Sequence, residues 1–261
     1  MIKALFFDID GTLVSFKTHH VPESTIEALT LAKKAGVEVY ISTGRPFAII
    51  NQVLDEIKHL IDGYITANGA YCFIGDKVIS CSPIPLHEVK RIVAKCDEVG
   101  AACIVVGEKD MTMVNPDEKS LWIFNVMLNV PDVGLGTPLE KVLSQPILQL
   151  TPFITEAQES EVIGKSDHLE SGRWYPDFVD LTARGVCKAE GLKAIAAYRG
   201  FSLSETMAFG DGGNDLSIIQ AAGTGIAMGN SNAVLLSAAD YVTTSVDDNG
   251  IYNALRHYGV I

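Results

Sequence analysis

Two acidic residues, Asp8 and Asp10, follow a short apolar run near the start of this 261-residue chain. Residues two apart on a strand project to the same side, so both carboxylates would lie together where the strand ends. Their repulsion requires a neutralising partner, and a divalent cation is one. A simple turn is the alternative, because Asp and Gly favour turns. The pair alone does not decide between a metal site and a turn.

A second acidic cluster lies at residues 210–215, where glycines alternate with Asp211, Asn214 and Asp215. It too follows an apolar run, and its glycines allow the backbone to approach a ligand closely. The simpler interpretation is a flexible turn in which Asn214 or Asp215 caps the next helix. Capping and ligand binding are compatible here.

Hydroxyl, amide and cationic groups occur at two further places. Residues 42–45 end an apolar run with Thr43, Gly44 and Arg45, and the helix expected next favours an anion at its start. Alone, this segment fits a helix cap followed by a solvated arginine. Lys188 stands at another expected helix start, where a cation gains nothing from the helix dipole. A nearby anion would explain it better.

Strand and helix patterns alternate at both ends of the chain. Strands are expected at 4–7, 37–42, 64–67, 206–209, 225–228 and 241–242, with helices at about 22–35, 47–60, 189–198, from 233, and up to 257. This alternation is typical of right-handed βαβ units and predicts an α/β, Rossmann-like parallel sheet. Ligands bind beyond the carboxyl ends of such strands, where the polar groups fall.

The middle of the chain has a different pattern. Hairpins are expected at 71–80 and 102–114, a helix after Pro85, a helix and strand within 138–154, and short strands at 173–175 and 178–181. Hairpins mixed with helices indicate an α+β unit. We therefore expect an inserted domain, 82–184, within a core formed by 1–81 and 185–261.

If the core folds in this way, four distant polar groups meet at one rim of the sheet and supply the groups for phosphoryl transfer. The motifs Asp8-x-Asp10-Gly11-Thr12, Thr43-Gly44-Arg45, Lys188 and Gly210-Asp211-Gly212-x-Asn214-Asp215 resemble the four ordered motifs of the haloacid dehalogenase (HAD) superfamily. Asn68-Gly69-Ala70 and the insert are similar to its Cof-type sugar phosphatases. The phrases at 4–10 and 172–176 resemble bacterial hexose phosphate phosphatases, and the likeness covers nearly the whole chain.

The resemblance implies the HAD fold with a cap domain and an Mg²⁺-dependent phosphatase acting through an aspartyl phosphate on Asp8. The substrate would be a small phosphate ester, with sugar (hexose) phosphates the leading class. Asp10 would be the general acid and base, and Mg²⁺ would be held by Asp8, Asp211 and the Asp10 backbone carbonyl. The resemblance further implies catalytic roles for Thr43 and Lys188, substrate contacts from Thr43, Gly44, Arg45, Lys188 and Asn214, and supporting roles for Asp215 and Asn68.

Two assignments keep an alternative. Arg45 contacts either the substrate or the structure around it. In the insert, Arg173, Trp174 and Tyr175 are expected to contact substrate, whereas a core aromatic pair with a surface arginine explains them equally well.

Three other functions stay open from the sequence. A phosphomutase of the same superfamily would pass the phosphoryl group to a sugar instead of water. A response-regulator receiver also surrounds a phosphorylated Asp with acidic residues, a Thr and a Lys, but it carries no large insert. A sugar-binding module without catalysis is disfavoured, because Asp8 and Asp10 are both present.

Composition limits the partners. The formal net charge of −12 argues against nucleic acid, whose binding depends on phosphate neutralisation, and against anionic membranes, which the overall charge should repel. The five cysteines form no CxxC pair, and no apolar run is long enough to span a membrane. We expect reduced thiols, a cytoplasmic location, and a monomer or weak homo-oligomer.

Overall fold

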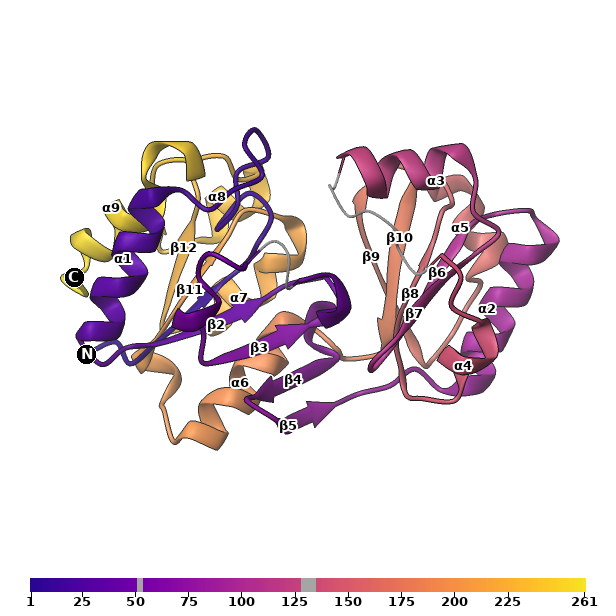
Figure 1. Ribbon diagram of the computed structural model, residues 1–261, viewed down its shortest axis with the longest axis horizontal. Helices are drawn as coiled ribbons and strands as arrows, with labels where there is room; N and C mark the ends of the chain where they lie inside the picture. The colour runs from indigo at the N-terminus through magenta and orange to yellow at the C-terminus, as the bar shows by residue number, and fades with distance from the viewer. Residues whose placement is uncertain (51–53, 128–134) are drawn as a thin grey trace. The chain divides into compact units, whose positions relative to one another are not determined.

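The structure is a computed structural model that describes residues 1–50, 54–127 and 135–261 and, of Trp174, only the backbone. The chain forms two compact units (Figure 1). The first unit contains Met1–Arg45, Ile50–Ser80 and Cys187–Ile261, and the second contains Pro46–Ile49 and Cys81–Val186. Among the described helices, none has the length and apolar character needed to cross a membrane.

The first unit is built on one sheet with the strand order β13-β12-β11-β1-β2-β3-β4-β5. Its strands are β1 (Ala4–Phe7), β2 (Glu38–Ser42), β3 (Gly63–Thr66), β4 (Tyr71–Ile74), β5 (Lys77–Cys81), β11 (Thr206–Gly210), β12 (Thr224–Ala227) and β13 (Tyr241–Val242). The strands from β13 to β3 pair in parallel, and β4 is antiparallel to β3. The predicted α/β parallel-sheet core is confirmed.

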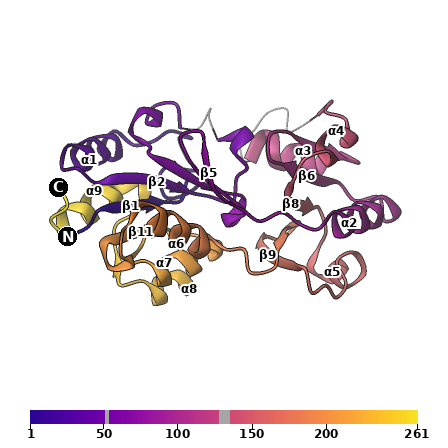
Figure 2. The same cartoon turned by 90° about the horizontal axis from the view of Figure 1, so that it is seen from below.

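Helices cover both faces of this sheet. Helices α1 (Glu23–Lys34) and α9 (Gly250–His257) lie on one face, and α6 (Lys188–Arg199), α7 (Leu216–Ala221) and α8 (Ala233–Ala238) lie on the other (Figure 2). The four residues of β1 are therefore fully buried. A central parallel strand must be apolar on both faces, which explains the continuous apolar run that starts the chain.

The helix expected at 47–60 is wrong for the residues that the structure describes there. Phe47–Ile49 and Lys58–Leu60 each form a short 3-10 turn, while residues 51–53 lie outside the described chain. The chain passes from the second unit to the first after Ile49. Ile49 packs into an apolar cluster of the second unit, whereas Ile50 and Leu54 are buried in the first. Tertiary packing therefore overrides the helical pattern.

The second unit is a five-stranded antiparallel sheet with the order β7-β6-β8-β10-β9. Its strands are β6 (Cys103–Gly107), β7 (Met111–Val114), β8 (Ile147–Pro152), β9 (Leu169–Tyr175) and β10 (Phe178–Ala183), and its helices are α2 (Leu86–Glu98), α3 (Glu118–Trp122), α4 (Leu139–Leu143) and α5 (Glu156–Val162). A π-helical turn, Ile123–Met127, follows α3. Apolar residues of α2, including Val89 and Ile92, pack with Val105 and Leu150 of the sheet.

Candidate active site

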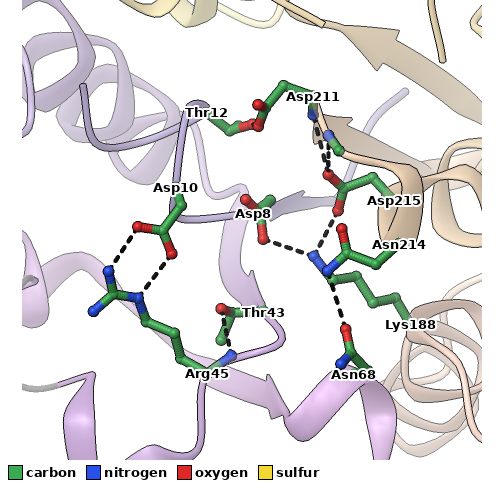
Figure 3. Close-up of polar contacts among 11 residues, drawn as sticks. Asp8, Asp10, Thr12, Thr43, Arg45, Asn68, Lys188, Asp211, Asn214 and Asp215 are labelled. Carbon is green, nitrogen blue, oxygen red and sulfur yellow. Dashed lines mark hydrogen bonds and ion pairs between the residues drawn. The ribbon is translucent and has the colours of Figure 1, made fainter. Parts of the chain in front are cut away.

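The carboxyl ends of three neighbouring strands meet at one rim of the first unit's sheet. Phe7 at the end of β1 lies in register with Ile41 of β2 and Phe209 of β11. The residues that follow these strands therefore come together, although they are far apart in sequence. Figure 3 shows Asp8, Thr43 and Asp211 in this arrangement, with Lys188 reaching the same place from the start of α6.

Lys188 forms the centre of a buried ion-pair network. Its Nζ donates to Asp8 Oδ1 and to Asp215 Oδ1, each at 2.6 Å (Figure 3). Lys188 is 0% exposed, Asp8 7% and Asp215 1%. Burial lowers the pKa of Lys188, but the attraction of Asp215 and Asp8 more than offsets it, so its pKa is raised. The unfavourable position at the helix start is explained by two anions.

The acidic groups of this network repel one another. Burial raises the pKa of Asp8 well above its usual value, Lys188 opposes the shift, and Asp215 and Asp211 add to it. Burial, followed by the charge of Asp215, also raises the pKa of Asp211 to about 7, although a hydrogen bond from Thr12 and the charge of Lys188 oppose it. One oxygen from each of these three carboxylates lies within 4.8 Å of the others. An all-oxygen cluster of this kind suits a hard divalent cation such as Mg²⁺.

Asp215 and Asp211 each have further hydrogen-bond partners. Asp215 Oδ2 accepts hydrogen bonds from the backbone amides of Asp211 (3.0 Å) and Gly212 (2.9 Å), and its other oxygen accepts from Lys188. Asp215 thus holds the loop and the lysine together, and its supporting role in catalysis stays a prediction. Asp211 Oδ1 accepts from the Thr12 hydroxyl at 2.8 Å, which orients the Asp211 carboxylate.

The side chain of Asp10 turns to a different partner. Arg45 donates from Nε to Asp10 Oδ2 and from Nη2 to Asp10 Oδ1, both at 2.7 Å (Figure 3). The acidic group that could hold a metal, among the described residues, consists of Asp8, Asp211 and Asp215. Any contribution of Asp10 to a metal site would therefore come from its backbone carbonyl, as the family resemblance implies.

Two loops hold the Thr43–Arg45 segment in place. The backbone amide of Asn68 donates to the Thr43 carbonyl (3.0 Å), and the backbone amide of Ala67 donates to the Arg45 carbonyl (3.2 Å). Within the segment, the backbone amide of Arg45 donates to the Thr43 hydroxyl (3.0 Å). From the other side, Asn214 Nδ2 donates to Asn68 Oδ1 at 3.0 Å. Two predicted site residues, Asn68 and Asn214, are thus joined to each other.

The Asn68 loop adopts an unusual backbone conformation. Ala67, Asn68 and Gly69 all have positive φ, at +48°, +55° and +106°. A Cβ added to Gly69 would lie 2.2 Å from the carbonyl oxygen of Cys187, the residue before Lys188. Only glycine fits this position, where the loop supports the start of α6.

Gly69→Ala should therefore damage both stability and activity. The strained φ and the contact with a backbone carbonyl should lower the free energy of unfolding by about 3 kcal/mol. The displaced start of α6 should also move Lys188 from Asp8. Chemical denaturation and phosphate release measure the two effects. Gly75→Ala is the control, because Gly75 has a φ of +55° but nothing within 4 Å of an added Cβ. If both variants behave alike, the close approach at Gly69 is not important.

One residue beside the site, Asn230, was not predicted from the sequence. Asn230, which follows β12, donates from Nδ2 to the Gly11 carbonyl at 2.8 Å and accepts from the Val246 amide at 3.0 Å. It therefore connects the loop after Asp10 to a third loop. The sequence does contain a pattern that could have predicted Asn230. It lies in a polar run directly after a parallel strand, at the same rim of the sheet as Asp211.

Of the residues predicted to contact substrate in the insert, Arg173 has structural partners. Arg173 donates to Glu159 in α5 (2.8 Å) and to the backbone carbonyls of Tyr175, Pro176 and Phe178. These bonds give Arg173 a structural role, although its side chain, 18% exposed, is not the surface arginine of the alternative, and substrate contact stays a prediction. The side chain of Trp174 lies outside the described residues.

Comparison with known proteins agrees with this fold. Residues 5–255 match the model of the haloacid dehalogenase-like hydrolases. The chain therefore belongs to this hydrolase family, and the resemblance seen in its motifs is confirmed.

Particular relatives resemble the chain over its full length. YkrA of Bacillus subtilis (strain 168) is 30% identical over 262 residues, covering 99% of this chain and 98% of YkrA. Among solved structures, the HAD subclass IIB sugar phosphatase BT4131 is 49% identical with a TM-score of 0.92, covering 99% of this chain and 100% of that one. The phosphatase BT1666 from Bacteroides thetaiotaomicron is 36% identical with a TM-score of 0.88, covering 100% and 96%.

Proposed function

We propose that this hydrolase is an Mg²⁺-dependent phosphatase that cleaves small phosphorylated metabolites, with hexose phosphates as the leading class, through an aspartyl phosphate on Asp8. One observation carries the proposal: the buried Asp8 carboxylate shares Lys188 with Asp215 and lies within 4.8 Å of Asp211. A nucleophile, a cation and a group of metal ligands are thus in one place. The likeness to the sugar phosphatase BT4131 supports the substrate class.

The residues divide the reaction between them. Asp8 attacks phosphorus, the bond from phosphorus to the leaving oxygen breaks, and Asp10 gives that oxygen a proton. Asp10 then takes a proton from the water that hydrolyses the aspartyl phosphate. General acid–base catalysis of this kind contributes roughly 10²–10⁴-fold. The Thr43 hydroxyl and the Gly44 amide hold phosphoryl oxygens, and Lys188 offsets their charge.

The residues present fit Mg²⁺. The carboxylates of Asp8 and Asp211, with the backbone carbonyl of Asp10, would hold the ion, while Asp215 and Asn214 support the surrounding loop. When bound, the ion neutralises the repulsion between nucleophile and phosphate. Burial raises the pKa of both Asp8 and Asp211, and a cation between them would oppose that shift by favouring the ionised carboxylates.

A screen of phosphorylated metabolites tests the proposal. The purified protein should release inorganic phosphate from hexose phosphates with Mg²⁺, and EDTA should remove the activity until Mg²⁺ is restored. Measuring sugar phosphate isomers in the same reactions distinguishes a phosphomutase, which would convert isomers without releasing phosphate. Failure to hydrolyse any ester with Mg²⁺ would reject the proposal, and hydrolysis confined to other metabolites would reject the hexose assignment.

The pKa of Asp211 predicts how pH and Mg²⁺ act together. Between its usual pKa of 3.8 and the folded value of about 7, Asp211 binds a proton more tightly in the folded protein than in the unfolded chain. Rising pH across this window should therefore destabilise the metal-free protein. Because Mg²⁺ binds the ionised carboxylate, the stabilisation it gives should grow across the same window.

Thermal unfolding from about pH 4 to about pH 8, with EDTA and with Mg²⁺, measures this coupling. The side chain introduced by Asp211→Asn does not titrate, so this variant should lose the part of the pH dependence of stability that comes from Asp211. Mg²⁺ should also stabilise the variant less than it stabilises wild type. An equal Mg²⁺ stabilisation at every pH would contradict the prediction.

A further inference from the structure

The pair formed by Asp10 and Arg45 uses both oxygens of one group and two nitrogens of the other. The two hydrogen bonds, both 2.7 Å long, form the parallel fork that a guanidinium makes with a carboxylate. A fork fixes the plane of the carboxylate as well as its position, which a single contact cannot do. The orientation of Asp10 is therefore set by Arg45.

Arg45 is itself firmly held. Its side chain is 11% exposed, whereas that of Asp10 is 28% exposed. Its backbone amide donates to the Thr43 hydroxyl in the same segment and its carbonyl accepts from the Ala67 amide of the neighbouring loop, so both ends of the residue are held. Burial lowers the pKa of Arg45, but Asp10 and Asp8 raise it further than burial lowers it. The guanidinium is thus a charged and preorganised partner for Asp10.

We propose that Arg45 is a positioning residue for Asp10, and that it promotes the reaction through this carboxyl group instead of binding the phosphoryl group. The inference rests on the proposed function and departs from the role in substrate binding expected from the sequence. To protonate the leaving oxygen, Asp10 turns one oxygen toward it, while the other oxygen keeps its bond to Arg45. The fork commits Nε and Nη2 of Arg45 to Asp10.

The leaving group separates these two roles. An alkyl phosphate such as a hexose phosphate needs a proton on its leaving oxygen, whereas 4-nitrophenyl phosphate releases a stable anion. The ratio kcat/KM reports steps up to the release of the first product, so it isolates phosphoryl transfer to Asp8 from the later hydrolysis. We would measure it for both esters with wild type, Arg45→Ala, Arg45→Lys, Asp10→Asn and the Arg45→Ala/Asp10→Asn double variant.

If Arg45 positions Asp10, Asp10→Asn should lower kcat/KM for the alkyl ester by roughly 10²–10⁴-fold. Arg45→Ala should lower it by about 10²-fold, the usual effect of a misplaced catalytic group. For the aryl ester, both variants should show a much smaller decrease in kcat/KM. The double variant should be no worse than Asp10→Asn, because Arg45 acts only through Asp10. Arg45→Lys should not rescue the alkyl ester, since an ammonium cannot form the fork.

The opposite pattern would overturn the inference. If Arg45 binds the phosphoryl group, Arg45→Ala should lower kcat/KM equally for both esters. The loss in kcat/KM should then add to that of Asp10→Asn in the double variant. Arg45→Lys should restore much of the kcat/KM lost in Arg45→Ala. Arg199→Ala is the matched control, because Arg199 donates from Nε and Nη2 to Glu38 in an exposed pair of the same unit. A wild-type protein inactive on both esters would reject the proposed function and not the role of Arg45.

Discussion

Asp8→Asn should abolish turnover in a protein that still folds. The amide is not a nucleophile toward phosphorus, so we expect activity to fall by at least about 10⁴-fold. The side chain keeps its shape, and Lys188 keeps Asp215 as a counterion at 2.6 Å. Replacing a carboxylate whose pKa is raised by burial also removes a desolvation cost. The free energy of unfolding should therefore change by only about 1 kcal/mol.

Two measurements check this prediction. Phosphate release gives the loss of turnover, and mass spectrometry after an acid quench shows whether a phosphorylated enzyme accumulates. Wild type should give the phosphorylated species and Asp8→Asn should not. Asp76→Asn, in the exposed turn between β4 and β5, makes the same substitution away from the site and should behave as wild type. Phosphorylation that persists in Asp8→Asn would show that another residue is the nucleophile.

Lys188→Met should impair both catalysis and folding. Methionine fills a similar volume but leaves Asp8 and Asp215 without the cation that contacts both. Removing one partner of a buried ion pair typically costs about 3–5 kcal/mol, because the remaining charges stay buried. Loss of the positive charge beside the phosphoryl group should also lower kcat by about 10²–10³-fold.

The same helix offers the control for this variant. Lys193 lies in α6 and pairs with Glu190 at 2.7 Å, but both side chains are about half exposed. Exposed ion pairs contribute little to the free energy of unfolding, so Lys193→Met should leave both stability and activity nearly unchanged. Added Mg²⁺ should recover part of the stability lost in Lys188→Met, since it also neutralises Asp8. A Lys188→Met protein as stable as wild type in EDTA would contradict the buried network.

Much of the core and its site was predictable because the signals are local and repeat. Each strand of the parallel sheet is a short apolar run, and each chemically important loop follows such a run directly. The rule that these loops meet at one rim is sufficient to bring Asp8, Thr43 and Asp211 together. Lys188 was explained once two anions were found beside it.

Other features depend on contacts between distant residues, which no local pattern reports. The apolar spacing at 47–60 is helical, but Ile49 and Ile50 pack into different units and the chain makes separate turns. The position of Asp10 beside the same strand end was predicted, but its pairing with Arg45 through two hydrogen bonds was not. The bonds of Arg173 to Glu159 and to three carbonyls depend on β9, β10 and α5 meeting, which the sequence does not specify.

The position of β1 has a consequence for protein synthesis. β1 pairs with β2 on one side and with β11 on the other, so one partner is translated almost at once and the other only near the end. Until β11 leaves the ribosome, β1 is an apolar edge strand open to wrong pairing. The strands of the second unit are translated in one stretch and pair only with one another, so that sheet can form first. We therefore expect chaperone binding and aggregation of the nascent chain to be greatest between the completion of β10 and the emergence of β11.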